Sequence, residues 1–203
     1  MELQSITSKQ TDIGQLSLTR RVALVACLAA LCIGTNYAML PLPNIKLMDA
    51  MVFTTGLFFG VVPGISVAAI AWLVYGVLNP LGLILPVLLT VIPCEMIYAL
   101  VGGFLRRTAT GSTSSNSRNL ERNVVFGAVG LFSTLAYDLI TNAVSGLLSY
   151  NSIWMGLLTM NVPIPLGIMH EASNFVFFAT LTPVLLRLLG KGRFSSEIGS
   201  RRQ

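Results

Sequence analysis

The sequence predicts an all-α, polytopic membrane protein with six transmembrane helices and both termini in the cytoplasm. Of the 203 residues, 54% are hydrophobic and only 10% are charged, and the mean hydropathy is +0.76. A soluble domain of this length carries considerably more charge. Because each helical crossing takes roughly 20 apolar residues, the chain has room for about six crossings joined by short loops.

The first three spans are bounded by turns that contain proline and glycine, residues that stop or interrupt helices. Residues 41–46 hold two prolines, Pro63 is followed by Gly64, and residues 79–82 read Asn-Pro-Leu-Gly. The second and third spans are short for a bilayer, so membrane thinning or tilting of their neighbours is expected. After a polar cytoplasmic segment at residues 1–21, the spans are expected at residues 22–40, 47–62 and 65–78.

The last three spans are expected at residues 83–105, 123–148 and 164–189. The fourth carries Pro86 and Pro93, and a kink is expected at one of them. Residues 106–122 are rich in Ser, Thr, Gly and Arg, which predicts a mobile cytoplasmic linker. Residues 149–162 are less apolar and are expected along the membrane interface or partway into the membrane.

The distribution of cations predicts the orientation of these spans. With the N-terminus in the cytoplasm and six crossings, twelve of the 13 Lys and Arg residues fall inside and only Lys46 falls outside, in agreement with the positive-inside rule. The inside residues are Lys9, Arg20, Arg21, Arg106, Arg107, Arg118, Arg122, Arg187, Lys191, Arg193, Arg201 and Arg202. The net charge of +5 therefore indicates topology and not a nucleic-acid partner. Residues 22–189 form the membrane domain, and residues 190–203 form a basic cytoplasmic tail.

Polar and aromatic side chains gather toward the outer ends of the spans, whereas the inner halves are almost entirely apolar. A charged carboxylate at the bilayer centre costs about 2.5–3.5 kcal/mol, so Glu95, Asp138 and Glu171 are expected to face protein or water. No Lys or Arg lies at a matching depth, which leaves His170, protonation or a bound solute to offset these charges. The candidate substrate-binding residues are Asn36, Tyr37, Trp72, Tyr75, Asn79, Glu95, Tyr98, Asp138, Asn142, His170, Glu171 and Asn174.

The same polar pattern also allows two structural interpretations. The polar side chains could join helices to one another by hydrogen bonds, and Trp72 and Tyr75 could belong to an interfacial aromatic belt. Asp49, at the outer start of the second span, and Thr134, in the fifth, belong to the polar pattern but are not counted among the candidates.

Small residues line one face of the first span. Ala26 and Ala30 are four residues apart, and Ala23 and Cys27 repeat the same spacing. Small side chains at this spacing let another helix approach closely. The neighbour could be a helix of this chain or a helix of a partner membrane protein.

Motifs for catalysis, cofactors and metals do not occur in the sequence. It contains no G-x-x-x-x-G-K-[ST] phosphate-binding loop and no G-x-S-x-G elbow. The pair His170-Glu171 does not complete His-Glu-x-x-His, because Asn174 occupies the last position. The three cysteines form no Cys-x-x-Cys pair. We therefore predict no enzyme activity, no bound cofactor and no metal site in this chain.

Five segments together resemble the substrate-binding S components of energy-coupling factor (ECF) transporters. They are Leu42-Pro-Asn-Ile-Lys46, Trp72-Leu-Val-Tyr-Gly76, Asn79-Pro-Leu-Gly82, Tyr137-Asp-Leu-Ile-Thr-Asn142 and His170-Glu-Ala-Ser-Asn174. The resemblance extends over residues 22–189, and the order and spacing of the segments carry it.

The resemblance implies a six-helix protein of a prokaryotic plasma membrane that takes up a vitamin, a vitamin precursor or a metal ion. It also implies a transmembrane T component, which would dock on Ala26 and Ala30, and two ATPase subunits that use ATP. The loop after the first span would act as a lid, with Pro43, Asn44 and Lys46. Metal-specific relatives carry a histidine motif near the N-terminus, and the only histidine here is His170, so a metal carrier of that type is not expected.

The function predicted is high-affinity capture of a vitamin or vitamin precursor from outside the cell for ATP-driven import. The surplus of acids and aromatics at pocket depth favours a cationic or donor-rich flat ring, such as a thiamine-like heterocycle. The alternative is a stand-alone secondary carrier, proton-coupled through Glu95 or Glu171. Such carriers usually have inverted repeats, and no convincing internal repeat is found in this sequence.

Overall fold

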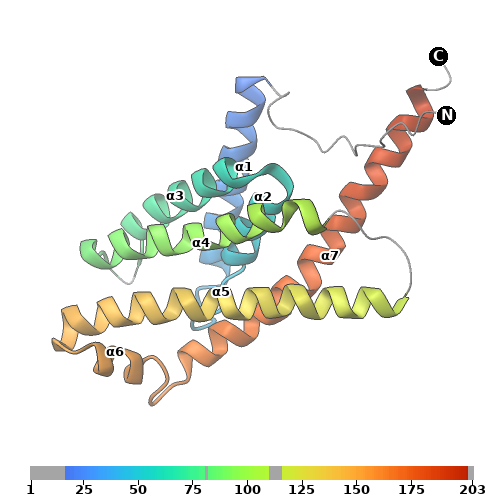
Figure 1. Cartoon of the computed structure of the whole chain (residues 1–203). Coiled ribbons are helices and arrows are strands. Elements are labelled where there is room, and N and C mark those ends of the chain that lie inside the picture. The colour runs from blue at the N-terminus through green and yellow to red at the C-terminus, as the bar shows by residue number, and fades with distance from the viewer. Residues whose placement is uncertain (1–16, 81, 110–115, 201–203) are drawn as a thin grey trace.

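A computed structural model describes residues 17–80, 82–109 and 116–200, which contain seven helices and no strand (Figure 1). The predicted all-α class is confirmed for these residues. Parts of the predicted N-terminal segment, linker and tail lie outside the described ranges. The helices are α1 (Leu18–Ala38), α2 (Met48–Phe59), α3 (Val61–Val77), α4 (Leu85–Ala109), α5 (Asn116–Tyr150), α6 (Ile153–Thr159) and α7 (Leu166–Ser200).

Several of these helices have the composition of membrane-spanning segments. In the described chain, three stretches are long and apolar enough to cross a membrane, namely Leu18–Ala38, Leu85–Arg106 and Leu120–Tyr150. Helices α2 and α3 are also apolar but have only 12 and 17 residues. The chain is therefore a membrane protein by the length and composition of its helices.

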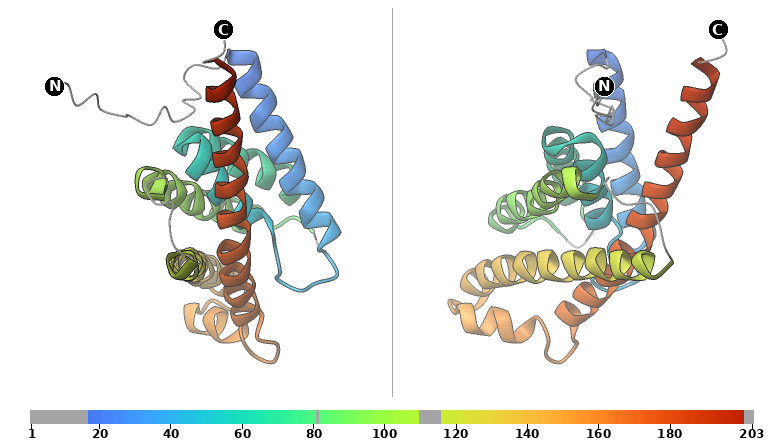
Figure 2. Two further views of the ribbon diagram at one scale, coloured as in Figure 1. Left: turned by 90° about the vertical axis from the view of Figure 1, so that its right-hand side faces the viewer. Right: turned by 45° about the vertical axis from the view of Figure 1, so that its right-hand side comes forward.

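The helices pack in two connected groups. Helices α2 and α3 pack against α4, while α5 packs along α7 and α6 packs on α5. Figures 1 and 2 show α3, α4 and α5 with roughly parallel axes, and α1 and α7 crossing them more steeply. The two groups meet where α4 contacts α5 and where α2 contacts α7. Most of the buried core lies around α2, of which every residue from Met48 to Leu57 is buried.

The turn between α2 and α3 differs from the sequence prediction, which placed it at Pro63-Gly64. The break is at Gly60, which has φ +101°, a backbone conformation that side-chain-bearing residues rarely adopt. Pro63 is the third residue of α3, where a backbone N–H has no partner within the helix and its loss costs little. The predicted turn was therefore wrong by about one helical turn.

The predicted linker at residues 106–122 is also more helical than expected. Helix α4 continues to Ala109 and α5 begins at Asn116, so the described parts of this segment extend the two neighbouring helices. Arginine is a good helix former, and the four arginines of this segment lie in its two described, helical ends. Residues 149–162, for which no single conformation was predicted, contain the short helix α6.

Helices α2 and α4 approach each other closely at glycines. A Cβ atom added to Gly102 would overlap the carbonyl oxygen of Phe53, and one added to Gly56 would overlap that of Ala99. Because each clash would involve backbone, the helices would have to separate to make room. These glycines bring α2, which carries Asp49, against α4, which carries Glu95 and Tyr98.

Candidate functional site

The centre of the candidate site is His170 on α7, whose imidazole lies between two carboxylates. Its Nδ1 is 3.0 Å from Asp138 Oδ1 on α5, and its Nε2 is 2.6 Å from Asp49 Oδ2 on α2. All three residues are buried, with His170 only 1% exposed. Since a carboxylate accepts hydrogen bonds, only a ring with protons on both nitrogens can donate to both acids. His170 thus joins three helices at one point.

A chain of hydrogen bonds extends this centre toward α4. Asn174 Nδ2 donates to Asp49 Oδ2 and to Thr134 Oγ1, both at 2.7 Å. Tyr98 Oη donates to Thr134 Oγ1 at 3.0 Å, and Thr134 Oγ1 in turn donates to the Gly130 carbonyl at 2.8 Å. The buried polar network, as we call it below, consists of Asp49, Tyr98, Thr134, Asp138, His170 and Asn174.

Helical periodicity explains how the network is assembled. His170 and Asn174 are four residues apart on α7, and Thr134 and Asp138 are four apart on α5. Residues at this spacing share one face of a helix. Each helix therefore presents two polar groups, one turn apart, to the other along the α5–α7 contact.

A second group of side chains forms the aromatic cluster, defined as Tyr37, Lys46, Trp72, Tyr75 and Glu95. Trp72 Nε1 donates to Glu95 Oε2 at 3.0 Å, and Lys46 Nζ lies 5.0 Å from the centre of the Trp72 ring. The Tyr75 ring packs edge-on against Trp72 and against Tyr37, with centroids 5.8 and 5.3 Å apart. Glu95 is fully buried and stands three residues before Tyr98 on α4. Helix α4 thus links the cluster to the buried polar network.

Three candidate residues each keep a buried oxygen without a hydrogen bond. These oxygens are Asn36 Oδ1 on α1, Glu95 Oε1 on α4 and Asn174 Oδ1 on α7. Leaving a buried acceptor unpaired costs about 1–3 kcal/mol. The two amide oxygens accept hydrogen bonds, as Glu95 Oε1 does when that acid is ionised, and a molecule that satisfies them supplies N–H or O–H donors.

The other candidates surround these two groups. Asn142 is half-buried, and its Nδ2 donates to the Asp138 backbone carbonyl at 2.8 Å. Tyr37 Oη donates to the Leu78 carbonyl at 2.9 Å, and Asn79 is half-buried next to that residue. Glu171 is half-buried. Since it directly follows His170 in α7, it points away from the face shared by His170 and Asn174.

The loop between α1 and α2 also contacts the site. Asn44, which has φ +56°, donates from Nδ2 to the Leu166 carbonyl at the start of α7, at 2.9 Å. Lys46, at the end of the same loop, lies over Trp72. The loop therefore connects the start of α7 with the aromatic cluster.

Sequence reasoning missed Asp49 and Thr134 as members of the site. Asp49 was placed at the outer start of a span, where water could solvate it, yet it is buried and contacts both His170 and Asn174. An acid that is the only charged residue in the stretch from Met48 to Leu57 was the available signal. Thr134 is short and uncharged, and its position between Tyr98 and Asn174 depends on the packing of three helices.

Comparison with known proteins gives a family match over most of the chain. Residues 17–191 match the model of a family described as "ECF-type riboflavin transporter, S component". No curated protein and no solved structure matches this chain. The matched range contains every residue of the buried polar network and of the aromatic cluster.

Proposed function

From the premise that this chain belongs to the ECF-type riboflavin transporter S component family, we propose that it captures riboflavin outside the cell for ATP-driven import. Family membership confirms the predicted resemblance to ECF S components. It also confirms that the chain is a transporter component and not an enzyme. The match over residues 17–191 is the observation that carries the proposal.

The chemistry of the site is compatible with riboflavin, which the family match favours over a cationic substrate. Asp49 and Asp138 both contact His170, so these two acids have a partner within the protein. The unpaired groups are acceptors: Asn36 Oδ1, Glu95 Oε1 and Asn174 Oδ1. Riboflavin is uncharged, and its ring imide and ribityl hydroxyls are donors. This proposal therefore prefers riboflavin to the thiamine-like ring favoured by the sequence pattern.

The aromatic cluster supports a flat ligand. Trp72 and Tyr75 are both buried, and their rings stand beside Glu95, which holds one of the unpaired acceptors. Aromatic faces pack well against a planar ring. In the proposal the flavin ring lies against this cluster, and the α1–α2 loop, with Pro43, Asn44 and Lys46, covers it.

The orientation and the partners are part of the same proposal. We propose six crossings in a prokaryotic plasma membrane, with both termini in the cytoplasm. In Figure 1 the start of α1 and the end of α7 lie at the top, whereas the end of α4 and the start of α5 lie toward the right. These ends carry the arginines of the positive-inside pattern. Ala26 and Ala30 are exposed on α1, as docking to a T component with two ATPase subunits requires.

Substitution of Glu95 by Gln tests the site. Gln keeps an oxygen for Trp72 Nε1 but replaces the unpaired Oε1 by an NH2 donor. A hydrogen bond to a charged group contributes about 1.5–3 kcal/mol, so E95Q is expected to bind riboflavin roughly 10- to 100-fold more weakly. Calorimetry or quenching of flavin fluorescence on the detergent-purified chain measures this.

A matched control is Glu121→Gln on α5, since Glu121 is exposed near the start of that helix. It should bind riboflavin like the unchanged chain. Equal affinity in E95Q and E121Q would reject the site, and no riboflavin binding by the unchanged chain would reject the substrate. Riboflavin uptake by liposomes that hold this chain alone would favour the stand-alone carrier instead.

A further inference from the structure

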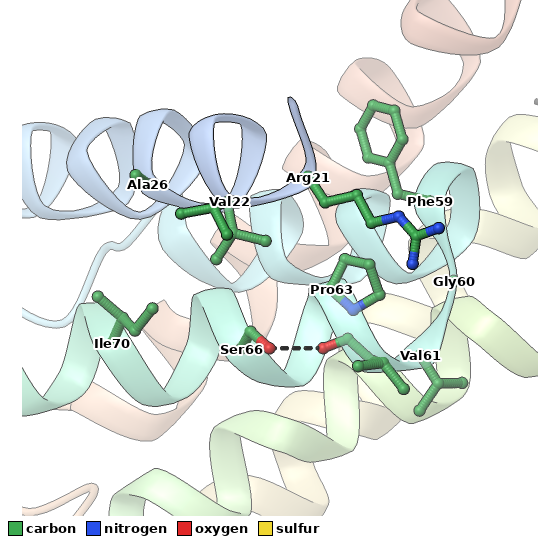
Figure 3. Close-up of a pocket in the computed structure, with 11 residues that line it drawn as sticks. Arg21, Val22, Ala26, Phe59, Gly60, Val61, Pro63, Ser66 and Ile70 are labelled. Atoms are coloured by element: carbon green, nitrogen blue, oxygen red, sulfur yellow. Dashed lines mark hydrogen bonds between the residues drawn. The ribbon is translucent and has the colours of Figure 1, made fainter. Parts of the chain in front are cut away.

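A pocket of about 630 Å³ lies between the first half of α1, the α2–α3 turn and the first half of α3 (Figure 3). On α1 its lining runs from Arg21 to Ala26, whereas the nearest site residue on that helix is Asn36. Ten residues of helix separate Ala26 from Asn36 by roughly 15 Å at 1.5 Å per residue, and on α3 the side chain of Ile70, which lines the pocket, is exposed whereas that of Trp72 is buried. The pocket is therefore distinct from the candidate substrate site.

The walls of the pocket are apolar and open toward the surroundings of the protein. Val22 is 60% exposed, Val62 is 75% exposed, and Ile70 is 41% exposed, although all three line it. Ser66 Oγ also lines the pocket but donates to the Val62 carbonyl at 2.9 Å, so its hydrogen bond is made within α3 (Figure 3). Within a membrane domain, an exposed apolar groove of this kind faces hydrocarbon. Its walls suit an acyl chain better than a polar solute.

One end of the pocket is positively charged. Figure 3 shows the Arg21 side chain extending from α1 toward Phe59 and Gly60. Arg106, from the end of α4, approaches the same turn, because a Cβ atom added to Gly60 would lie 3.0 Å from Arg106 Nη1. Two guanidinium groups from different helices thus converge on Gly60. The absence of a side chain at Gly60 leaves room for Arg106.

We propose that this pocket binds an anionic phospholipid, with an acyl chain in the groove between α1 and α3 and the phosphate beside Arg21 and Arg106. The charge at one end and the apolar walls beyond it match the two parts of such a lipid. Basic pockets between helices at the cytoplasmic side of a membrane are known to bind anionic head groups. The planar guanidinium group of arginine can form two parallel hydrogen bonds to a phosphate. Ala26 lines the same pocket, so the lipid covers part of the face proposed for docking the T component.

Lipid retention by the purified full-length chain tests this proposal. The chain is exchanged into mixed micelles with equal amounts of phosphatidylglycerol and phosphatidylcholine of the same acyl chains, and bound lipid is counted by native mass spectrometry. The unchanged chain is expected to retain phosphatidylglycerol preferentially. Since each cation near a lipid surface contributes about 1 kcal/mol, R21Q/R106Q should bind it roughly 30-fold more weakly.

The control R20Q/R187Q removes the same charge from two exposed residues and should retain phosphatidylglycerol like the unchanged chain. S66F, which fills the groove, should weaken binding of the lipid without changing the charge. Thermal unfolding of each variant shows that it is folded.

Three results of the retention measurement would overturn the proposal. They are equal retention of the two lipids by the unchanged chain, equal loss in both arginine pairs, and undiminished binding by S66F. Full competition by glycerol phosphate, which has no acyl chain, would also overturn it. If the groove bound only a helix of the T component and no lipid, the unchanged chain would retain the two lipids equally.

Discussion

Substitution of His170 by Leu is expected to lower the free energy of unfolding by about 3–5 kcal/mol, since it removes one partner from a buried ionic group. Asp49 and Asp138 would then face an apolar side chain, with neither access to water nor their shared donor. Helices α2 and α5 would both lose their hydrogen bond to residue 170 of α7. Denaturant titration of the purified chain in detergent measures the loss.

Two companion variants separate charge from packing in this prediction. H170Q keeps a donor for one of the two carboxylates and should lose about half as much stability as H170L. Adding Asp49→Asn and Asp138→Asn to H170L removes the buried charges and should recover part of the loss. A decrease below about 1 kcal/mol in H170L, within the range of a single neutral hydrogen bond, would show that the imidazole does not hold these acids.

Substitution of Gly102 by Ala is expected to destabilise the protein by about 3 kcal/mol, at the upper end of the cost of overpacking. The added methyl group would meet the Phe53 backbone oxygen, which cannot move without the whole of α2. Separation of α2 from α4 would also displace Asp49 from Tyr98 and Glu95. Riboflavin affinity should therefore fall together with stability in G102A.

Gly34 on α1 offers the matched control, because a Cβ atom there would have no neighbour within 4 Å. G34A should be neutral or slightly stabilising, since alanine favours helix more than glycine by up to about 1 kcal/mol. Equal effects of G34A and G102A on the unfolding midpoint would contradict the close approach of α2 and α4.

The sequence was a reliable guide to properties that depend on composition and local pattern. Low charge and long apolar stretches predicted helices, and the apolar character of α1, α4 and most of α5 agrees with membrane spans. Local exceptions were harder to foresee. The break at Gly60, three residues before Pro63, follows from a positive φ that either glycine at this turn could have adopted.

The partners within the site could not be predicted, because they are distant in sequence. Asp49 and His170 are 121 residues apart, and Asn174 and Thr134 are 40 apart. The position of a residue along its helix indicates which other residues lie at the same depth in the membrane. It does not indicate which faces of the helices pack against one another. The sequence left His170 as one of three ways to offset the acids, and in the structure it contacts two acids, Asp49 and Asp138, because of how α2, α5 and α7 pack together.

Two weak contacts tie the α1–α2 loop to the rest of the protein, namely the hydrogen bond from Asn44 to the Leu166 carbonyl and the contact between Lys46 and Trp72. A hydrogen bond contributes about 0.5–1.5 kcal/mol net, and an accessible cation–π contact about 0.5–1 kcal/mol. Together these two contacts would stabilise the closed position of the proposed lid by about 1–2.5 kcal/mol. If these two contacts alone kept the proposed lid closed, the loop would be open for between about one part in six and one part in seventy of the time. A lid held this weakly would affect the rates of solute binding and release, whereas tight binding of the solute would depend on the side chains that the lid covers.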